Sequence, residues 1–314
     1  MTTSIRTRNT SGFALIGLAA LVWGTIPLSL AAAGAVNAVV IVFYRVAIAS
    51  VALLIIAAFT GSYRELSRLS RRGWLGLIAN GTLLAVNWAL FFLSIRLAGV
   101  AVGEILGYTG PVWVAAMMPL VLGEDFDSRV VVPLALALGG IIAMLLATTS
   151  GESGSSALLG VVLAFFSSVT YALLMLNTKR LLGGVGAISL MLVEDVVAAL
   201  LLTPVLFFWA SPSTAAEWGA MSTLALVQTV GAGLLFMYGL SRVRVDHGAV
   251  LTYGEPVSAV IFGALFLGQR ITLPVVLGGI AVITGGLMVA RLQPVSSIDA
   301  PGMLSLEPSE GNAS

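Results

Sequence analysis

Two stretches of the chain share one pattern: residues 103–123 read GEILGYTGPVWVAAMMPLVLG, and residues 248–268 read GAVLTYGEPVSAVIFGALFLG. Each contains Tyr-x-x-Pro, and each ends on Leu-Gly twelve residues after the proline. The two copies lie 145 residues apart, and the same spacing also relates other pairs: Gly103 and Gly248, Leu106 and Leu251, Val112 and Val257, and Gly140 and Gly285. This spacing predicts an internal duplication, the property that decides the fold.

The composition around these stretches is that of a membrane protein. Of 314 residues, 59% are hydrophobic, 9% are charged and none is cysteine. Too few charges remain to coat a water-soluble domain of this size, and the hydrophobicity excludes a disordered chain. The net charge of +1 gives no electrostatic footprint for nucleic acid. The lipid bilayer is therefore the predicted surrounding of most of the chain.

Long apolar runs predict ten transmembrane helices, since about 20 apolar residues are needed to cross the hydrocarbon core. The runs do not alternate as the strands of a membrane barrel would. The predicted spans are 13–33, 38–59, 74–95, 100–122, 130–147, 157–176, 187–209, 218–239, 247–267 and 272–292. The first span is interpreted as a retained signal-anchor, because nine more follow it.

The duplication divides these spans into two repeats of five, residues 13–147 and 157–292. Five is an odd number, so the second repeat begins on the opposite side of the membrane and the repeats have inverted topology. Secondary transporters are often built in this way, with a site near the midplane between the repeats. Residues 1–12 are expected to be a cytoplasmic segment, and residues 293–314 a disordered cytoplasmic tail.

The basic residues predict the orientation. With the N-terminus inside, twelve of them fall in cytoplasmic segments, whereas Arg96 and Arg270 fall on the other side and Arg45 lies within a span. This bias predicts that both termini are cytoplasmic. The compact ten-span plan and the absence of a transit peptide favour a multi-pass protein of a bacterial plasma membrane. The twelve are Arg6, Arg8, Arg64, Arg68, Arg71, Arg72, Arg129, Lys179, Arg180, Arg242, Arg244 and Arg291.

Several short motifs resemble one family. They are Tyr108-Thr109-Gly110-Pro111-Val112-Trp113, Gly254-Glu255-Pro256-Val257, Val22-Trp23-Gly24, Tyr44-Arg45, and the glycine pairs Gly278-Gly279 and Gly285-Gly286. In order and duplication they resemble the EamA family of the drug/metabolite transporter superfamily. The stretch 87–95, followed by Thr-Gly-Pro, is similar to the threonine/homoserine exporter branch. The resemblance implies a transporter with two five-helix repeats.

Ionisable residues inside the spans are functional candidates, because a charge in hydrocarbon is costly. Glu255 is the strongest candidate, for binding a substrate ammonium or carrying a proton, since it lies deep and precedes Pro256, which loosens the helix. Structural hydrogen bonding is its alternative role. Arg45 and Glu104 lie at compatible depths for a salt bridge. The shallower Glu194 and Asp195 are expected to face the cytoplasmic interface or a neighbouring cation.

Aromatic and amide side chains are predicted to line the rest of a substrate cavity. Tyr108 and Tyr253 recur in both repeats and lie well inside their spans, which fits an interfacial aromatic belt poorly. The glycine pairs are expected to serve close helix packing instead. The full predicted lining comprises Trp23, Asn87, Trp88, Tyr108, Tyr171, Tyr238 and Tyr253.

The sequence shows no cofactor, metal-ligand or catalytic constellation. His247 is the single histidine, next to Asp246, and is expected to be a solvated residue at a helix start rather than a proton relay. Residues 183–186 form a glycine-rich loop without the strand that a nucleotide fingerprint needs. We therefore expect no enzyme activity, no metal and no cofactor.

The leading hypothesis is a secondary transporter that exports a small polar metabolite, such as an amino acid, by alternating access. Proton exchange through Glu255 and facilitation without coupling both fit the sequence. One alternative is efflux of hydrophobic drugs or other xenobiotics, and an alternative from another class is a membrane-embedded lipid-modifying enzyme. Because one monomer contains both repeats, it suffices for function.

Overall fold

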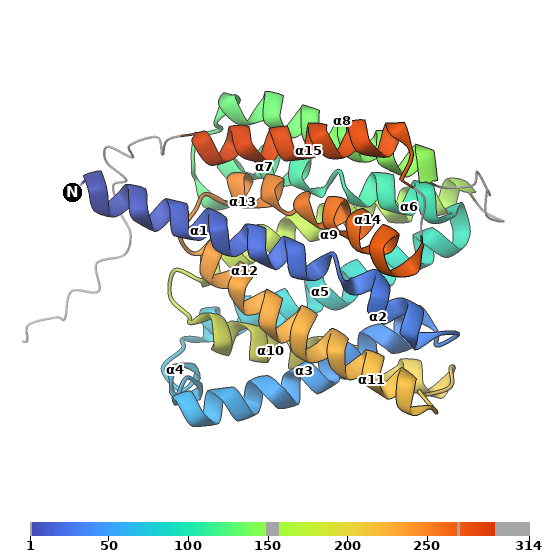
Figure 1. Cartoon of the computed structure of the whole chain (residues 1–314). Helices are drawn as coiled ribbons and strands as arrows, with labels where there is room; N and C mark the ends of the chain where they lie inside the picture. The colour runs from blue at the N-terminus through green and yellow to red at the C-terminus, as the bar shows by residue number, and fades with distance from the viewer. Residues whose placement is uncertain (1, 149–156, 269–270, 293–314) are drawn as a thin grey trace, which may run out of the picture.

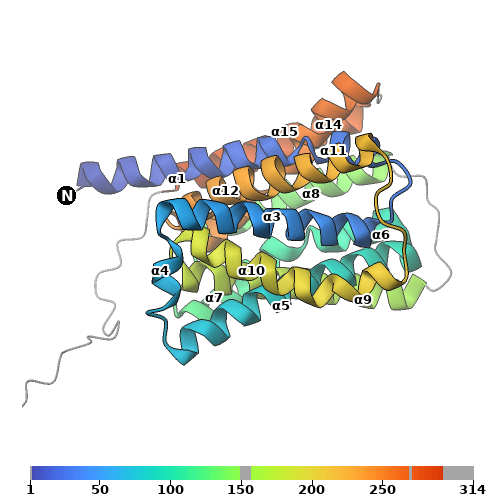
Figure 2. The same cartoon turned by 90° about the horizontal axis from the view of Figure 1, so that it is seen from below.

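The computed structural model describes residues 2–148, 157–268 and 271–292, which form a bundle of helices lying roughly along one long axis (Figures 1 and 2). Ten of its segments are long and apolar enough to cross a membrane, and each overlaps one of the ten predicted spans. The prediction of ten spans is therefore confirmed. The predicted tail lies outside the described residues.

The first repeat contains spans one to five. Its helices are α1 (Thr2–Trp23), α2 (Ile26–Ala33), α3 (Ala38–Thr60), α4 (Tyr63–Leu66), α5 (Arg71–Ala98), α6 (Val100–Gly107), α7 (Gly110–Leu122), the short 3-10 helix η1 (Ser128–Val130) and α8 (Val131–Thr148). The first span is α1 continued by α2, and the fourth is α6 continued by α7.

The second repeat contains spans six to ten. Its helices are α9 (Ala157–Leu181), α10 (Ala187–Leu202), the 3-10 helix η2 (Thr203–Phe207), α11 (Ala215–Thr223), the π-helix η3 (Leu224–Gly231), α12 (Ala232–Leu240), α13 (Val245–Leu251), α14 (Gly254–Leu267) and α15 (Leu273–Arg291). The eighth span is α11, η3 and α12 in sequence, and the ninth is α13 continued by α14.

Both copies of Tyr-x-x-Pro coincide with a break in a span. The fourth span is interrupted at Tyr108 and Thr109, and the ninth is interrupted at Thr252 and Tyr253. Pro111 is the second residue of α7 and Pro256 is the third residue of α14, positions at which a backbone N–H has no partner within the helix, so its absence costs nothing. Interrupted helices at membrane depth free backbone carbonyls, which are tolerated only where protein or a cavity covers them.

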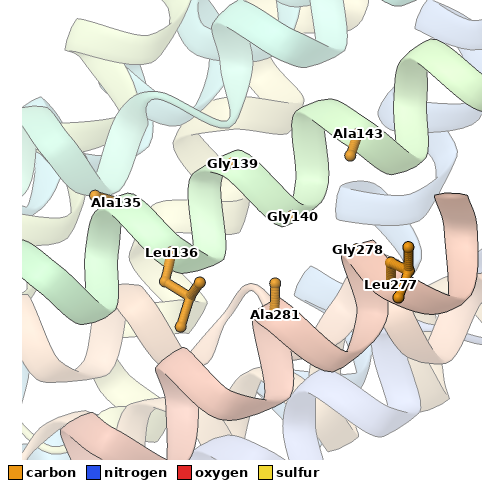
Figure 3. Close-up of a pocket in the computed structure, with 8 residues that line it drawn as sticks. All are labelled: Ala135, Leu136, Gly139, Gly140, Ala143, Leu277, Gly278 and Ala281. Atoms are coloured by element: carbon orange, nitrogen blue, oxygen red, sulfur yellow. The ribbon is translucent and has the colours of Figure 1, made fainter.

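The last helices of the two repeats, α8 and α15, lie side by side (Figure 1). Glycines allow this approach: a β-carbon added at Gly140 would lie 2.5 Å from the carbonyl oxygen of Gly278, and one at Gly278 would be closer still to that of Gly140. Figure 3 shows these glycines beside a shallow groove lined only by glycine, alanine and leucine. The prediction that the glycine pairs serve packing is thus correct for α8 and α15.

One end of the bundle carries basic residues from several helices, and we call it the basic end. They include Arg64 of α4, Lys179 and Arg180 in the last turn of α9, and Arg291 in the last turn of α15. The N-terminal end of α1 and the short helix α4 both lie there, on the left of Figure 1. Two of the contacts at this end tie helices together: Lys179 Nζ donates to the carbonyl oxygens of Leu240 and Val243, at 2.7 and 2.6 Å, and Glu65 accepts from the N–H of Gly186.

Candidate functional site

Arg45 of α3 interacts with groups from four other spans. Its Nε donates to Thr229 Oγ1 of η3 at 2.5 Å, and its guanidinium lies over the ring of Trp88 in α5, 5.3 Å from the centroid. It also interacts electrostatically with the carboxylates of Asp195 in α10 and Glu255 in α14. Arg45 therefore draws together residues from both repeats.

The proposed partner of Arg45 was Glu104, and the structure corrects this. Among the ion pairs of the described residues, none joins Arg45 to Glu104. Glu104 instead lies within electrostatic range of Glu255 and Tyr108. Matching depth along two helices allowed the pairing, but the rotation of each helix turns Arg45 toward α10 and η3.

Glu194 and Asp195 do not face the membrane interface, which corrects the first of the two settings expected for them. Both are buried, at 7% and 3% exposure. Glu194 accepts from Asn80 Nδ2 at 2.8 Å, and Asn80 is in turn fixed by Asn177 at 2.9 Å. Asp195 has the neighbouring cation Arg45, while one of its carboxylate oxygens is buried with no hydrogen-bond partner among the described residues.

Three tyrosines meet at the two helix breaks. The Tyr253 hydroxyl donates to the Tyr108 carbonyl oxygen at 2.5 Å, and their ring centroids are 6.2 Å apart. Tyr171 of α9 is hydrogen-bonded to Thr252, and Tyr108 interacts electrostatically with Glu104 and Glu255 as well as with the other two tyrosines. The Tyr108 carbonyl, freed by the break in the fourth span, thus accepts a hydrogen bond from the tyrosine at the break in the ninth span.

The break in the first span is covered by the π-helix η3. Trp23 Nε1 donates to the Gln228 carbonyl oxygen at 2.7 Å, and Gln228 Nε2 donates to Thr25 and Ser29. The Gln228 side-chain oxygen is buried without a partner in the described residues. π-helical turns inside α-helices often occur at functional sites, and this one supplies both Gln228 and the Thr229 that binds Arg45.

Two of the predicted lining residues do not join this cluster. Asn87 Nδ2 donates to the Ser167 carbonyl oxygen at 2.7 Å, so it connects α5 to α9. Tyr238 is 40% exposed and has no ring contact or side-chain hydrogen bond to the cluster in the described residues. The structure brings together Trp23, Trp88, Tyr108, Tyr171 and Tyr253 with Arg45, Glu104 and Glu255.

Two features were not predicted from the sequence: the π-helix η3 and the burial of His247. Gln228 and Thr229 are a polar pair inside an otherwise apolar span, which is the signal that could have identified them. His247 is only 3% exposed, so the expectation of a solvated residue is wrong. Phe13 of α1 covers it, with ring centroids 6.3 Å apart. Within the described residues no group of three or more metal-ligating side chains occurs.

Ten spans in two inverted repeats, with interrupted helices meeting around buried charges, define the class of multi-pass membrane transporters. The chain belongs to the EamA-like transporter family, whose model matches it twice, at residues 10–146 and 158–291. The resemblance read from the sequence motifs is therefore confirmed at the level of the family.

The relatives agree with this assignment. An uncharacterized transporter of Archaeoglobus fulgidus is 25% identical over 65% of this chain and 72% of its own length. The uncharacterized transporter YwfM of Bacillus subtilis is 26% identical over 67% of this chain and 71% of its own length. One solved crystal structure has a TM-score of 0.78 over 89% of this chain and 97% of that chain, at 18% identity, which shows the same fold.

Proposed function

We propose that this transporter exports a small polar metabolite of the amino acid type by alternating access, with its substrate site between Arg45, Asp195 and Glu255. The observation that carries the proposal is the electrostatic interaction of one cation, Arg45, with two carboxylates, so that the three charges come from three helices and both repeats. Charges in hydrocarbon are costly and are kept where a substrate or ion uses them.

Charges of both signs favour a zwitterion over an apolar drug. A substrate carboxylate would bind Arg45, whose planar guanidinium is suited to carboxylates. A substrate ammonium would bind the Asp195 oxygen that has no partner, or Glu255. Trp88 and Trp23 would then contact the apolar part of the substrate. Efflux of a hydrophobic drug would use the same aromatic rings without needing the charges.

Glu255 is the proposed group for proton exchange. It is the second residue of α14, and its carboxylate interacts electrostatically with both Arg45 and Glu104. Release of a proton from Glu255 would strengthen its attraction to Arg45, and protonation would weaken it. Such a change provides a physical link between proton and substrate binding.

The proposed setting is a bacterial plasma membrane with the basic end in the cytoplasm, which follows the rule that basic loops remain inside. Both termini would then be cytoplasmic. One chain contains both repeats, so we propose that a monomer suffices.

Flux of amino acids into proteoliposomes, with and without an imposed pH gradient, tests the proposal. Glu255→Gln and Arg45→Gln are each expected to lower flux by about a hundredfold, the scale of two lost charge-assisted contacts. Arg68→Gln and Asp125→Asn, which remove exposed charges, are the matched controls.

Four outcomes would contradict parts of the proposal. Equal flux with and without the gradient removes proton exchange. Amino acid flux that survives both variants removes the assigned site. Flux of a hydrophobic dye but of no amino acid replaces the substrate class with xenobiotics, and turnover of a lipid by the same vesicles would favour the membrane-embedded enzyme instead.

A further inference from the structure

A cluster of charged side chains joins the two repeats at the basic end, well away from the site around Arg45. From the first repeat it contains Glu124 and Asp127, in the connection between α7 and η1. From the second it contains Arg244, Asp246 and His247, at the start of α13. The proposed transport chemistry uses none of these residues.

Arg244 is the centre of this cluster. Its guanidinium binds both carboxylate oxygens of Asp246, at 3.2 and 3.1 Å, and these contacts orient it across the gap between the repeats. On the far side it donates to the Asp125 carbonyl oxygen at 3.0 Å and lies 3.6 Å from Glu124 Oε2. Arg244 thus crosses from α13 to the end of α7, with Asp246 as its positioning residue.

The pair of Asp127 and His247 is a second crossing point. His247 Nε2 lies 3.7 Å from Asp127 Oδ2, and both side chains are almost fully buried. Arg129 holds Asp127 from its own side through two side-chain hydrogen bonds, which lower the pKa of Asp127 to about 2. Asp127 is therefore charged throughout the physiological pH range.

Among the described residues, the other end of the molecule has no equivalent. At the repeat spacing, the residues corresponding to Arg244, Asp246, His247 and Asp127 are Gly99, Ala101, Val102 and Thr272. Within the described residues, α13 packs against α7 at the basic end, whereas the corresponding helices α6 and α14 have little or no contact. The fold is duplicated, but in the part of the chain that the structure describes the charged crossing is found at the basic end alone.

We propose that Arg244, Glu124, Asp127 and His247 form a latch that closes the substrate passage at the basic end, and that this end opens only when the latch breaks. The proposal rests on the alternating access proposed above. It adds a specific closed end and the contacts that hold it. The face of α7 behind the latch is sealed: the Met118 sulfur lies 3.6 Å from Arg244 Nη2, and Met118 is fully buried.

Since the chain contains no cysteine, single introduced cysteines give a clean test. Met118→Cys reports access behind the latch, and Thr25→Cys reports access at the break of the first span, on the other side of the closed end. Exposed Ser67→Cys, beside α4, identifies which membrane side faces the basic end. Each is labelled in vesicles with a membrane-impermeant maleimide applied from one side.

Arg244→Gln is expected to raise labelling of Met118→Cys from the basic side about tenfold, because hydrogen bonds to a charged group are lost. Labelling of Thr25→Cys from the opposite side is expected to fall at the same time. Asp127→Asn should act in the same direction. Glu124→Gln should act more weakly, about twofold, since that contact is longer and more exposed. Arg242→Gln and Arg68→Gln are the matched controls and should leave both rates unchanged.

Opposite changes at the two reporters distinguish opening from unfolding, which would raise both rates. The double variant Arg244→Gln/Asp246→Asn repeats the test without leaving the buried Asp246 carboxylate unpaired. Unchanged Met118→Cys labelling in Arg244→Gln and Asp127→Asn would overturn the latch, as would an increase at both reporters. Labelling needs no substrate. If the variants open the basic end as expected but the unchanged protein transports no amino acid, the proposed function is contradicted and the latch is retained.

Discussion

In the first Tyr-x-x-Pro copy the residue before the proline is Gly110, whereas in the second copy the same position is Glu255. Gly110 leaves room for the ring of Tyr171, since a β-carbon there would lie 2.5 Å from it. Glu255 adds a carboxylate that interacts electrostatically with both Arg45 and Tyr108. The tyrosine and proline that the copies share form the break, and the position in which they differ decides what each break does.

The comparison makes a first prediction about where stability and transport separate. Gly110→Val should lower stability by about 1–3 kcal/mol, because the added side chain displaces the Tyr171 ring. Glu255→Ala should lower stability less than Gly110→Val does, because Asp195 remains as a counter-charge for Arg45, while flux is lost. Thermal unfolding of the purified protein in detergent measures the first effect.

Gly139→Val is the control for this experiment, because a β-carbon at Gly139 would meet nothing within 4 Å. If Gly110→Val is as stable as the Gly139 variant, the ring of Tyr171 does not depend on the glycine. If Glu255→Ala is less stable than Gly110→Val, Glu255 has a structural role instead.

A second prediction concerns the two tyrosines. Tyr253→Phe should cost about 1 kcal/mol, because it removes the donor to the freed carbonyl of Tyr108. Tyr108→Phe should cost less, since the Tyr108 hydroxyl makes no hydrogen bond among the described residues. Comparing the two unfolding midpoints measures the difference directly, and equal losses would show that both hydroxyls carry similar contacts.

The smallest expected effect is at Gly254, which takes the place of Thr109 in the second copy. A β-carbon there would meet only the β-carbon of Ala20, at 3.4 Å, an ordinary contact. Gly254→Ala should therefore change stability by less than about 0.5 kcal/mol. A larger loss would show that the second break needs glycine for a reason other than space.

The sequence was sufficient to predict the ten spans and their duplication, because span length and residue spacing are properties of the chain alone. At Pro256 it also indicated a loosened helix, whereas the break before Pro111 was not predicted. It did not find the partners of Arg45, because depth in the membrane does not fix the direction in which a helix side points. Only the packing of α3 against α10 and η3 decides that direction.

Burial was equally hard to predict. Glu194 and His247 lie near the ends of their spans, so both were expected near solvent. Glu194 is buried because Asn80 supplies a donor from another helix. His247 is buried because Phe13 and Asp127 come from distant parts of the chain to cover it. Neither neighbour is visible in the local sequence.

The π-helix η3 gives the eighth span a part that can change length and twist. Its wide turn lets Thr229 Oγ1 donate to the Leu224 carbonyl oxygen, five residues back, while accepting from Arg45. In an ordinary α-helix that carbonyl would take the backbone N–H of residue 228. A change of η3 into an α-helix would then rotate α12 about its own axis relative to α11. The hydrogen bond from Arg45 to Thr229 and the orientation of α12 therefore depend on the same turn of backbone.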